Sequence, residues 1–298
     1  MISFTTIVCP TDLSELSLPA LAHAAQLARW YGARVSVLHV TSSLLDEHPS
    51  LSETAALPTR PADREAPDDD VKAHVQEALE GVAFDVTVVA GKAAPRIVEH
   101  AERIGADLIV MGTHGRSGFD RLVHGSVTER VLAHAPCPVL VVPPHATARP
   151  HALFRHIVCA MDFSPSARAA FDIALDLARQ ANGTLRLLHA IEWYPEGEVI
   201  AAGRLDLEGF RTSLKDQASV RLAGLLDQVD RSWVDVQGVV AVGRPHRRIL
   251  EHADAEGADL LVMGAQGTEG MDLAVFGSTT RQVLAQARAP VLVTRGAR

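Results

Sequence analysis

The segment IVCPTDLSELSLPALAHAAQLAR, Ile7 to Arg29, decides the fold because the chain contains it twice. It returns 150 residues later as IVCAMDFSPSARAAFDIALDLAR, Ile157 to Arg179. A second segment, GKAAPRIVEHAERIGADLIVMG (Gly91 to Gly112), returns as GRPHRRILEHADAEGADLLVMG (Gly243 to Gly264). A unit of this length is far longer than a solenoid repeat. The sequence therefore predicts two complete domains that descend from one ancestor.

The length of 298 residues also suits two ordinary domains. We place the first domain at residues 1–145 and the second at residues 155–298, joined by a linker at residues 146–154. This linker lies within PPHATARPHALF, Pro143 to Phe154, whose prolines stop the last strand of the first domain from extending.

Within a domain, short apolar runs alternate with segments of helical spacing. Five runs rich in Val, Ile and Leu predict strands in the first domain: Thr6–Cys9, Val35–Val40, Val86–Val89, Leu108–Met111 and Val139–Val142. Their nearly continuous apolarity favours parallel strands that are covered on both faces. Apolar residues recur at helical spacing at Leu21, Ala24, Ala25 and Ala28, and in the second copy at Phe171, Ala174, Leu175 and Ala178.

The fold class that follows is α/β, with two tandem doubly wound domains of the Rossmann-like kind. Each is expected to be a five-stranded parallel sheet flanked by helices with right-handed crossovers. The segment Thr41–Asp70, dense in Pro, Ser, Asp and Glu, predicts a mobile loop before a helix over Val71–Leu79. Its counterpart, Ile191–Gln228, is expected to be more ordered.

Composition excludes several classes of function. A net charge of -8 argues against a protein that binds nucleic acid through its phosphate backbone. There is no leader pattern at the amino terminus and no apolar run of about 20 residues, so a cytoplasmic protein without membrane contact is expected. Cys9, Cys137 and Cys159 are widely separated and predict small buried side chains, not a disulfide or a zinc site.

A glycine-rich loop is repeated as well. VMGTHGRSGFDRLVHGS (Val110 to Ser126) returns as VMGAQGTEGMDLAVFGS (Val262 to Ser278). The loop follows a strand and precedes a helix, which is where doubly wound sheets bind ligands. Glycine lets backbone N–H groups approach a ligand, and a helix start favours an anion, so a phosphate group is the expected ligand. The spacing is neither GxGxxG nor GxxxxGK[ST].

Structural alternatives exist for the polar residues near this loop. Ser126 is followed by Glu129, which is the pattern of a capping box, whereas Ser278 is followed by Arg281 and cannot form one. Asp12 and Asp162, after the first strand of each domain, are each followed two residues later by Ser and could form a turn or a cap.

With these residues the chain resembles a tandem universal stress protein of the ATP-binding branch, which carries G-x2-G-x9-G-[ST]. The resemblance implies that Asp12 and Asp162 contact the ribose and that Val40 and Ala190 line the adenine. The implied contacts with the rest of the nucleotide, chiefly its phosphates, are Gly112, Thr113, His114, Gly115, Arg116, Gly118, Gly125, Ser126 and Val127, and Gly264, Gln266, Gly267, Gly270, Gly277, Ser278 and Thr279 in the second domain. Mg2+ is expected with a bound triphosphate, but no carboxylate pair is placed to hold it independently.

The two loops differ in charge. His114 and Arg116 could reach phosphate oxygens or remain solvated, whereas the second loop has Gln266, Thr268 and Glu269. We therefore expect a lower affinity or a different nucleotide state in the second domain.

No nucleophile, base and orienting group stand together in the sequence, so catalysis beyond slow ATP hydrolysis is not expected. The pairs Glu99–His100 and Glu251–His252 lack metal-site spacing and predict polar helix faces. His39 and His189, inside strands, predict core histidines with one satisfied nitrogen.

The leading hypothesis is a regulatory protein of the stress-response type, with one ATP site in each domain. The alternatives are an interaction module that binds no nucleotide and a slow ATP hydrolase. The resemblance also implies pairing through the last strands, Val139–Val142 and Val291–Thr294, either within one chain or in a homodimer.

Overall fold

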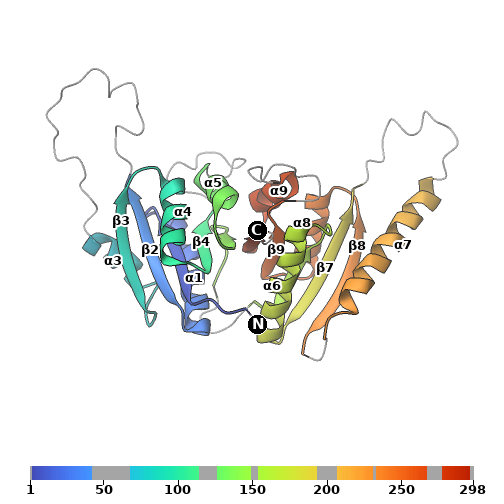
Figure 1. The fold of residues 1–298 in the computed structure, drawn as a ribbon, viewed down its shortest axis with the longest axis horizontal. Helices are drawn as coiled ribbons and strands as arrows, with labels where there is room; N and C mark the ends of the chain where they lie inside the picture. The colour runs from blue at the N-terminus through green and yellow to red at the C-terminus, as the bar shows by residue number, and fades with distance from the viewer. Residues whose placement is uncertain are drawn as a thin grey trace, which may run out of the picture. The chain divides into compact units, whose positions relative to one another are not determined.

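A computed structural model describes residues 2–41, 68–113, 126–148, 154–192, 207–230, 233–266 and 277–295. The chain separates into two compact units, residues 3–153 and 154–298 (Figure 1). Each unit has its own sheet and its own helices, as the repeat predicts.

The first unit alternates strands and helices in the expected order, with one short 3-10 turn, η1, added after the first strand. Its elements are β1 (Thr6–Thr11), η1 (Glu15–Ser17), α1 (Leu18–Tyr31), β2 (Arg34–Thr41), α3 (Asp68–Gln76), β3 (Phe84–Ala90), α4 (Ala93–Ile104), β4 (Leu108–Gly112), α5 (Ser126–His134) and β5 (Val139–Val142).

The second unit repeats this order. Its elements are β6 (His156–Ala160), α6 (Pro165–Ala181), β7 (Thr184–Ile191), α7 (Leu207–Leu226), β8 (Asp235–Val242), α8 (Pro245–Ala255), β9 (Leu260–Gly264), α9 (Ser278–Gln286) and β10 (Val291–Thr294).

All strand pairs within each sheet are parallel. The order is β3-β2-β1-β4-β5 in the first unit and β8-β7-β6-β9-β10 in the second. The chain thus builds outwards from the first strand of each unit and then returns to its other side, so the fold is doubly wound as predicted. The strand order reverses between β1 and β4, and again between β6 and β9.

The core lies between the sheets and the faces of the helices that the periodicity identified. Leu21, Ala24, Ala25 and Ala28 of α1 are 2% exposed or less. On α6, Ala174 and Ala178 are fully buried. The strand residues of β1, β4 and β5 are buried almost without interruption, as expected for parallel strands covered on both faces.

The boundaries of several elements differ from the predicted ones by a few residues. The first strand continues to Thr11, two residues beyond the predicted end, and α3 covers Asp68–Gln76 where Val71–Leu79 was expected. The expected mobile loop was Thr41–Asp70, of which Thr41 ends β2 and residues 68–70 begin α3; its other residues and part of its counterpart lie outside the described residues.

The prediction of small buried cysteines is confirmed for Cys9 and Cys159, whereas Cys137 is only half-buried. Cys9 and Cys159 are fully buried on β1 and β6, and none of the three is in a disulfide. Burial raises the pKa of the Cys9 thiol to about 12, so a thiolate is disfavoured at neutral pH.

Candidate functional site

The strand pairing ends early at the point where the strand order reverses. The β1–β4 pairing stops at Val8 and Ile109, although β1 continues to Thr11 and β4 to Gly112. In the second unit the β6–β9 pairing stops likewise at Cys159 and Val262. The carboxyl ends of these strands therefore have backbone groups that do not pair across the reversal, which is where ligands bind in open α/β sheets.

A tight turn follows β1. Asp12 Oδ1 accepts hydrogen bonds from the Ser14 amide at 3.1 Å and the Ser14 hydroxyl at 2.6 Å. Between them Leu13 has φ of 63°, a conformation that costs about 1 kcal/mol or more outside glycine. The surrounding bonds fix this strained backbone.

The second unit has the same turn. Asp162 Oδ1 accepts from the Ser164 amide at 2.9 Å, and Phe163 between them has φ of 66°. The alternative prediction, that these aspartates form a turn with the following serine, is thus confirmed for the Oδ1 atom of each. The ribose contact of Asp12 and Asp162 stays a prediction.

Two histidines tie the second strand of each unit to this turn. His39 Nδ1 bonds the Thr11 carbonyl at 2.9 Å, and His189 Nδ1 bonds the Met161 carbonyl at 2.7 Å. Each histidine has one satisfied nitrogen, as predicted, but only His39 is a buried core residue and His189 is half-buried. The bonds hold Val40 and Ala190, the next residues along, beside the end of the first strand of each unit.

Two buried threonines, which the sequence analysis missed, connect the helix after the glycine loop to the strand before it. Thr128 Oγ1 donates to the Gly112 carbonyl at 3.1 Å, and Thr280 Oγ1 donates to the Gly264 carbonyl at 3.0 Å. Both threonines are 4% exposed or less. The repeated GSVT and GSTT, with Thr at the same place, was the signal that could have identified them.

The second loop has an additional anchor. The hydroxyls of Ser164 and Ser166, at the start of α6, both donate to the Gln266 carbonyl. Ser164 also caps α6 by accepting from the Ala167 amide. In the first unit the position of Ser166 is taken by Leu16, which is 40% exposed and has no hydroxyl. The start of the second glycine loop is therefore held by a serine hydroxyl for which the first unit has no counterpart at Leu16.

Gly264 has a structural reason to be glycine. A Cβ at this residue would lie 2.5 Å from Ser166 Oγ and 2.9 Å from the Ala167 backbone nitrogen. The start of α6 therefore packs directly on Gly264. From the sequence, the same glycine is expected to let a phosphate approach the backbone.

The two serines of the motif lie inside the helices. Gly277 is the N-cap of α9 and Ser278 is its first residue, with no side-chain cap bond. Ser126 is likewise the first residue of α5. The capping-box alternative, which needs Ser126 at the N-cap, is therefore not supported. Both serines are exposed.

The described members of the expected site all lie at the carboxyl edge of their own sheet. They are Asp12, Val40, Gly112, Thr113, Ser126 and Val127, and Asp162, Ala190, Gly264, Gln266, Gly277, Ser278 and Thr279. The other expected residues fall outside the described part of the chain: His114, Gly115, Arg116, Gly118, Gly125, Gly267 and Gly270.

The prediction of a polar helix face was wrong for His100. It is 5% exposed and lies near the opposite, amino-terminal edge of the sheet, whereas its neighbour Glu99 is exposed and pairs with Arg96. Arg103 donates to His100 Nδ1 at 2.8 Å, and His100 Nε2 contacts the Ser36 hydroxyl at 2.9 Å. Burial and the charge of Arg103 lower the pKa of His100, against an opposing effect of Asp85.

These residues do not form a catalytic triad. Asp85 accepts from the Ser36 hydroxyl at 3.2 Å, whereas a triad needs the carboxylate on the histidine. Ser36 is 3% exposed and so is closed to a substrate.

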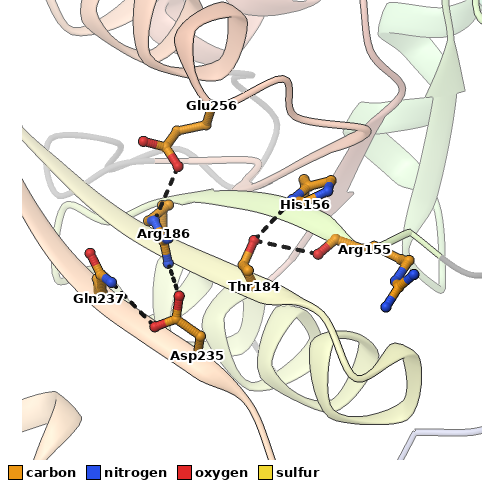
Figure 2. Close-up of polar contacts among 7 residues, drawn as sticks. All are labelled: Arg155, His156, Thr184, Arg186, Asp235, Gln237 and Glu256. Carbon is orange, nitrogen blue, oxygen red and sulfur yellow. Dashed lines mark hydrogen bonds and ion pairs between the residues drawn. The ribbon is translucent and has the colours of Figure 1, made fainter.

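The second unit builds its amino-terminal edge from ion pairs. Arg186, at the position of Ser36, contacts Asp235 at 3.1 Å and Glu256 at 3.2 Å. Figure 2 shows Arg186 between these two carboxylates, with Gln237 donating to Asp235. The Arg186 side chain is 15% exposed and its charge is balanced by carboxylates. The cluster is therefore a structural feature.

Within the described residues, no cluster of His, Cys, Asp and Glu could hold a metal ion. No described helix is long and apolar enough to cross a membrane.

Comparison with known proteins identifies the family. The model of the universal stress protein family matches residues 3–143 and 153–295. A universal stress protein of Methanocaldococcus jannaschii is 38% identical over 148 residues, which cover 47% of this chain and 82% of that protein. One from Mycobacterium tuberculosis is 29% identical over 201 residues, covering 67% of this chain and 65% of that protein.

A solved structure of the same fold covers both units. The universal stress protein from Archaeoglobus fulgidus superposes with a TM-score of 0.67 over 99% of this chain and 98% of that one, at 24% sequence identity. The chain therefore belongs to the universal stress protein family and carries two family domains in tandem.

Proposed function

We propose that each domain binds one adenine nucleotide, with ATP as the ligand, and that binding regulates how the chain acts in a stress response. The observation that carries this proposal is the early end of strand pairing at Val8 and Ile109, with Asp12 on one side and Gly112 on the other. The second unit repeats it between Asp162 and Gly264.

The groups at this edge fit a nucleotide chemically. Carboxylate oxygens accept from ribose hydroxyls, which suits Asp12 and Asp162. The first N–H groups of a helix lack partners within the helix, so the starts of α5 and α9 suit phosphate oxygens. Thr128 and Thr280 fix these helix starts against the strands. His114, Gly115, Arg116, Gly118 and Gly125, with Gly267 and Gly270, are proposed to complete the two phosphate sites. Mg2+ would be held chiefly by the phosphates.

The proposal is for binding rather than turnover. Among the described residues, Ser36, His100 and Asp85 bring a serine, a histidine and an aspartate together, but the carboxylate contacts the serine and not the histidine, and Ser36 and His100 are buried. A bound nucleotide regulates a protein when its affinity differs between two conformations. The competing functions are an interaction module without nucleotide and a slow ATP hydrolase.

The test is to extract the purified chain with acid and identify the released nucleotide, followed by ATP titration calorimetry. We expect one nucleotide for each domain, loss of one site in Asp12→Ala and of the other in Asp162→Ala, and no loss in the exposed control Glu99→Gln. If the extract contains no nucleotide and ATP gives no heat of binding, the proposed nucleotide binding is refuted and the interaction module is favoured. Steady release of phosphate from added ATP would favour the hydrolase.

The difference between the two loops has its own test. Nucleotide binding is compared in Gly115→Ala/Gly125→Ala and Gly267→Ala/Gly277→Ala variants, and the first pair is expected to lose the tighter site. Equal losses would contradict unequal sites. Pairing through the last strands and a homodimer stay predictions, which light scattering tests.

A further inference from the structure

We propose that Arg221 on α7 competes with the nucleobase for one face of Phe163, so that nucleotide binding in the second domain is coupled to helix α7. This inference rests on the proposed function, because it concerns the nucleoside end of the second site. It follows from three side chains, Phe163, His189 and Arg221, whose positions the structure describes.

Phe163 lies between the two residues expected to contact the nucleoside. It follows Asp162 directly, and its ring packs on His189, the residue before Ala190, with 4.9 Å between ring centroids and a tilt of 49°. His189 is fixed in turn by its bond to the Met161 carbonyl. The backbone of Phe163 has a φ of 66°, and the turn of Asp162 holds it there. The ring is therefore an oriented aromatic surface at the nucleoside end of the site.

Arg221 covers a face of this ring. Its guanidinium carbon lies over the Phe163 ring at 3.8 Å from the centroid. Among the described residues Arg221 forms no ion pair, and its guanidinium packs on the aromatic face of Phe163. The contact joins α7 to the turn after β6.

Helix α7 is otherwise attached to the sheet through its carboxyl-terminal half. Ala218, Leu222, Leu225 and Leu226 are buried, whereas residues 208–213 are all exposed. Losing the Arg221 contact would therefore release the turn after β6 from α7 without removing the buried anchors of the helix.

At the matching position the first domain has a leucine instead of this aromatic surface. Leu13 occupies the position of Phe163 with nearly the same backbone, at φ of 63°. A leucine offers neither a stacking face for a base nor a partner for a guanidinium. The coupling is thus specific to the second domain, and Leu13 shows which side chain that backbone tolerates in its place.

The strengths of the two contacts decide whether Arg221 or the base occupies the face of the Phe163 ring. A cation–π contact at an exposed site shifts an equilibrium by roughly two- to five-fold. Stacking of a base on an aromatic side chain is worth roughly five- to 150-fold. The base is therefore the stronger partner, and a nucleotide pays a small penalty for displacing Arg221.

The experiment measures second-site affinity in the full chain with Asp12→Ala to silence the first site. ATP and inorganic triphosphate are titrated calorimetrically against Arg221→Ala, Phe163→Leu and the double variant, with Arg211→Ala as control on an exposed turn of α7. We expect Arg221→Ala to tighten ATP binding roughly two- to five-fold and Phe163→Leu to weaken it roughly five-fold or more. Triphosphate, which has no base, should bind all variants equally. In the Phe163→Leu background, Arg221→Ala should have no effect.

Other outcomes are equally informative. Weaker ATP binding in Arg221→Ala would mean that the guanidinium supports the base. An unchanged affinity would mean that the guanidinium does not contact the base. Either result overturns the proposed competition and leaves the proposed function standing. Equal changes for ATP and triphosphate would assign the residues a merely structural role. Absence of ATP binding in this background and in the natural chain would refute the proposed function itself.

Discussion

Replacing Gly264 with alanine separates two explanations for the glycine at the end of β9. The new Cβ would lie 2.5 Å from Ser166 Oγ and 2.9 Å from both the Ala167 nitrogen and the Ser166 carbonyl carbon. A side-chain hydroxyl can rotate away, but the two backbone atoms belong to the first turn of α6 and cannot. Helix α6 or strand β9 has to shift.

The expected cost is that of overpacking a close contact, about 1–3 kcal/mol of unfolding free energy. The backbone of Gly264 is not in the left-handed region, so conformational strain adds nothing further. Gly224→Ala is the matched control, because a Cβ there meets nothing within 4 Å and the residue is exposed on α7. Alanine in a helix is favoured over glycine, so this control should gain about 0.5–1 kcal/mol.

Urea denaturation, with hydrogen exchange of β9 and α6 to report on the second unit, measures both variants. The packing explanation requires opposite signs for Gly264→Ala and Gly224→Ala. If Gly264→Ala proved as stable as the natural chain and yet lost ATP affinity, the packing argument would be refuted and the glycine would serve the ligand alone. Loss of stability and of second-site binding together would show that one contact serves both.

Three further predictions concern buried polar contacts. Thr128→Val and Thr280→Val each leave a strand-end carbonyl without its donor and should each lower the unfolding free energy by about 1 kcal/mol in urea denaturation; a neutral effect would contradict the role of these bonds. Ser166→Ala removes a donor from the Gln266 carbonyl and should weaken ATP binding at the second site without affecting the first, as read by calorimetry in single-site backgrounds. Because the folded chain lowers the pKa of His100 below its ordinary value of 6.5, the unfolded chain binds more protons just below that pH. The stability that neutral His100 contributes should therefore be fully present above about pH 6.5 and be lost as the pH falls towards the folded pKa. The urea midpoint of the His100→Gln variant should depend less steeply on pH than that of the natural chain.

The fold followed from the sequence because its signals are local and appear twice. The apolar runs and the helical spacing depend on residues within one element, and the repeat fixed the number of domains. The end of β1 was predicted too early because Pro10 cannot donate to a ladder. In the structure Pro10 lies beyond the last pair with β4 and is matched with Leu38 on β2, so the strand continues.

The parts of the site that were missed depend on partners distant in sequence. In the sequence Thr128 is indistinguishable from an ordinary helix residue, because its hydrogen bond to the Gly112 carbonyl is visible only in the structure. Ser166 looks like a second residue of a helix start, and its contact with Gln266 spans 100 residues. His100 was assigned to a polar face together with the polar residue Glu99 beside it, but adjacent helix residues point about 100° apart and one of them faces the sheet.

The two amino-terminal edges limit how the halves of this chain can be recombined. Arg186 lies between Asp235 and Glu256, whereas the position of Glu256 in the first unit is Ile104, next to Arg103. An arginine introduced at Ser36 would face Asp85, which already pairs with Arg34, and would lie near the guanidinium of Arg103. The exchange is therefore tolerated only if these neighbours change with it. Hybrids made by exchanging segments between the two halves should therefore be stable when they keep each cluster whole.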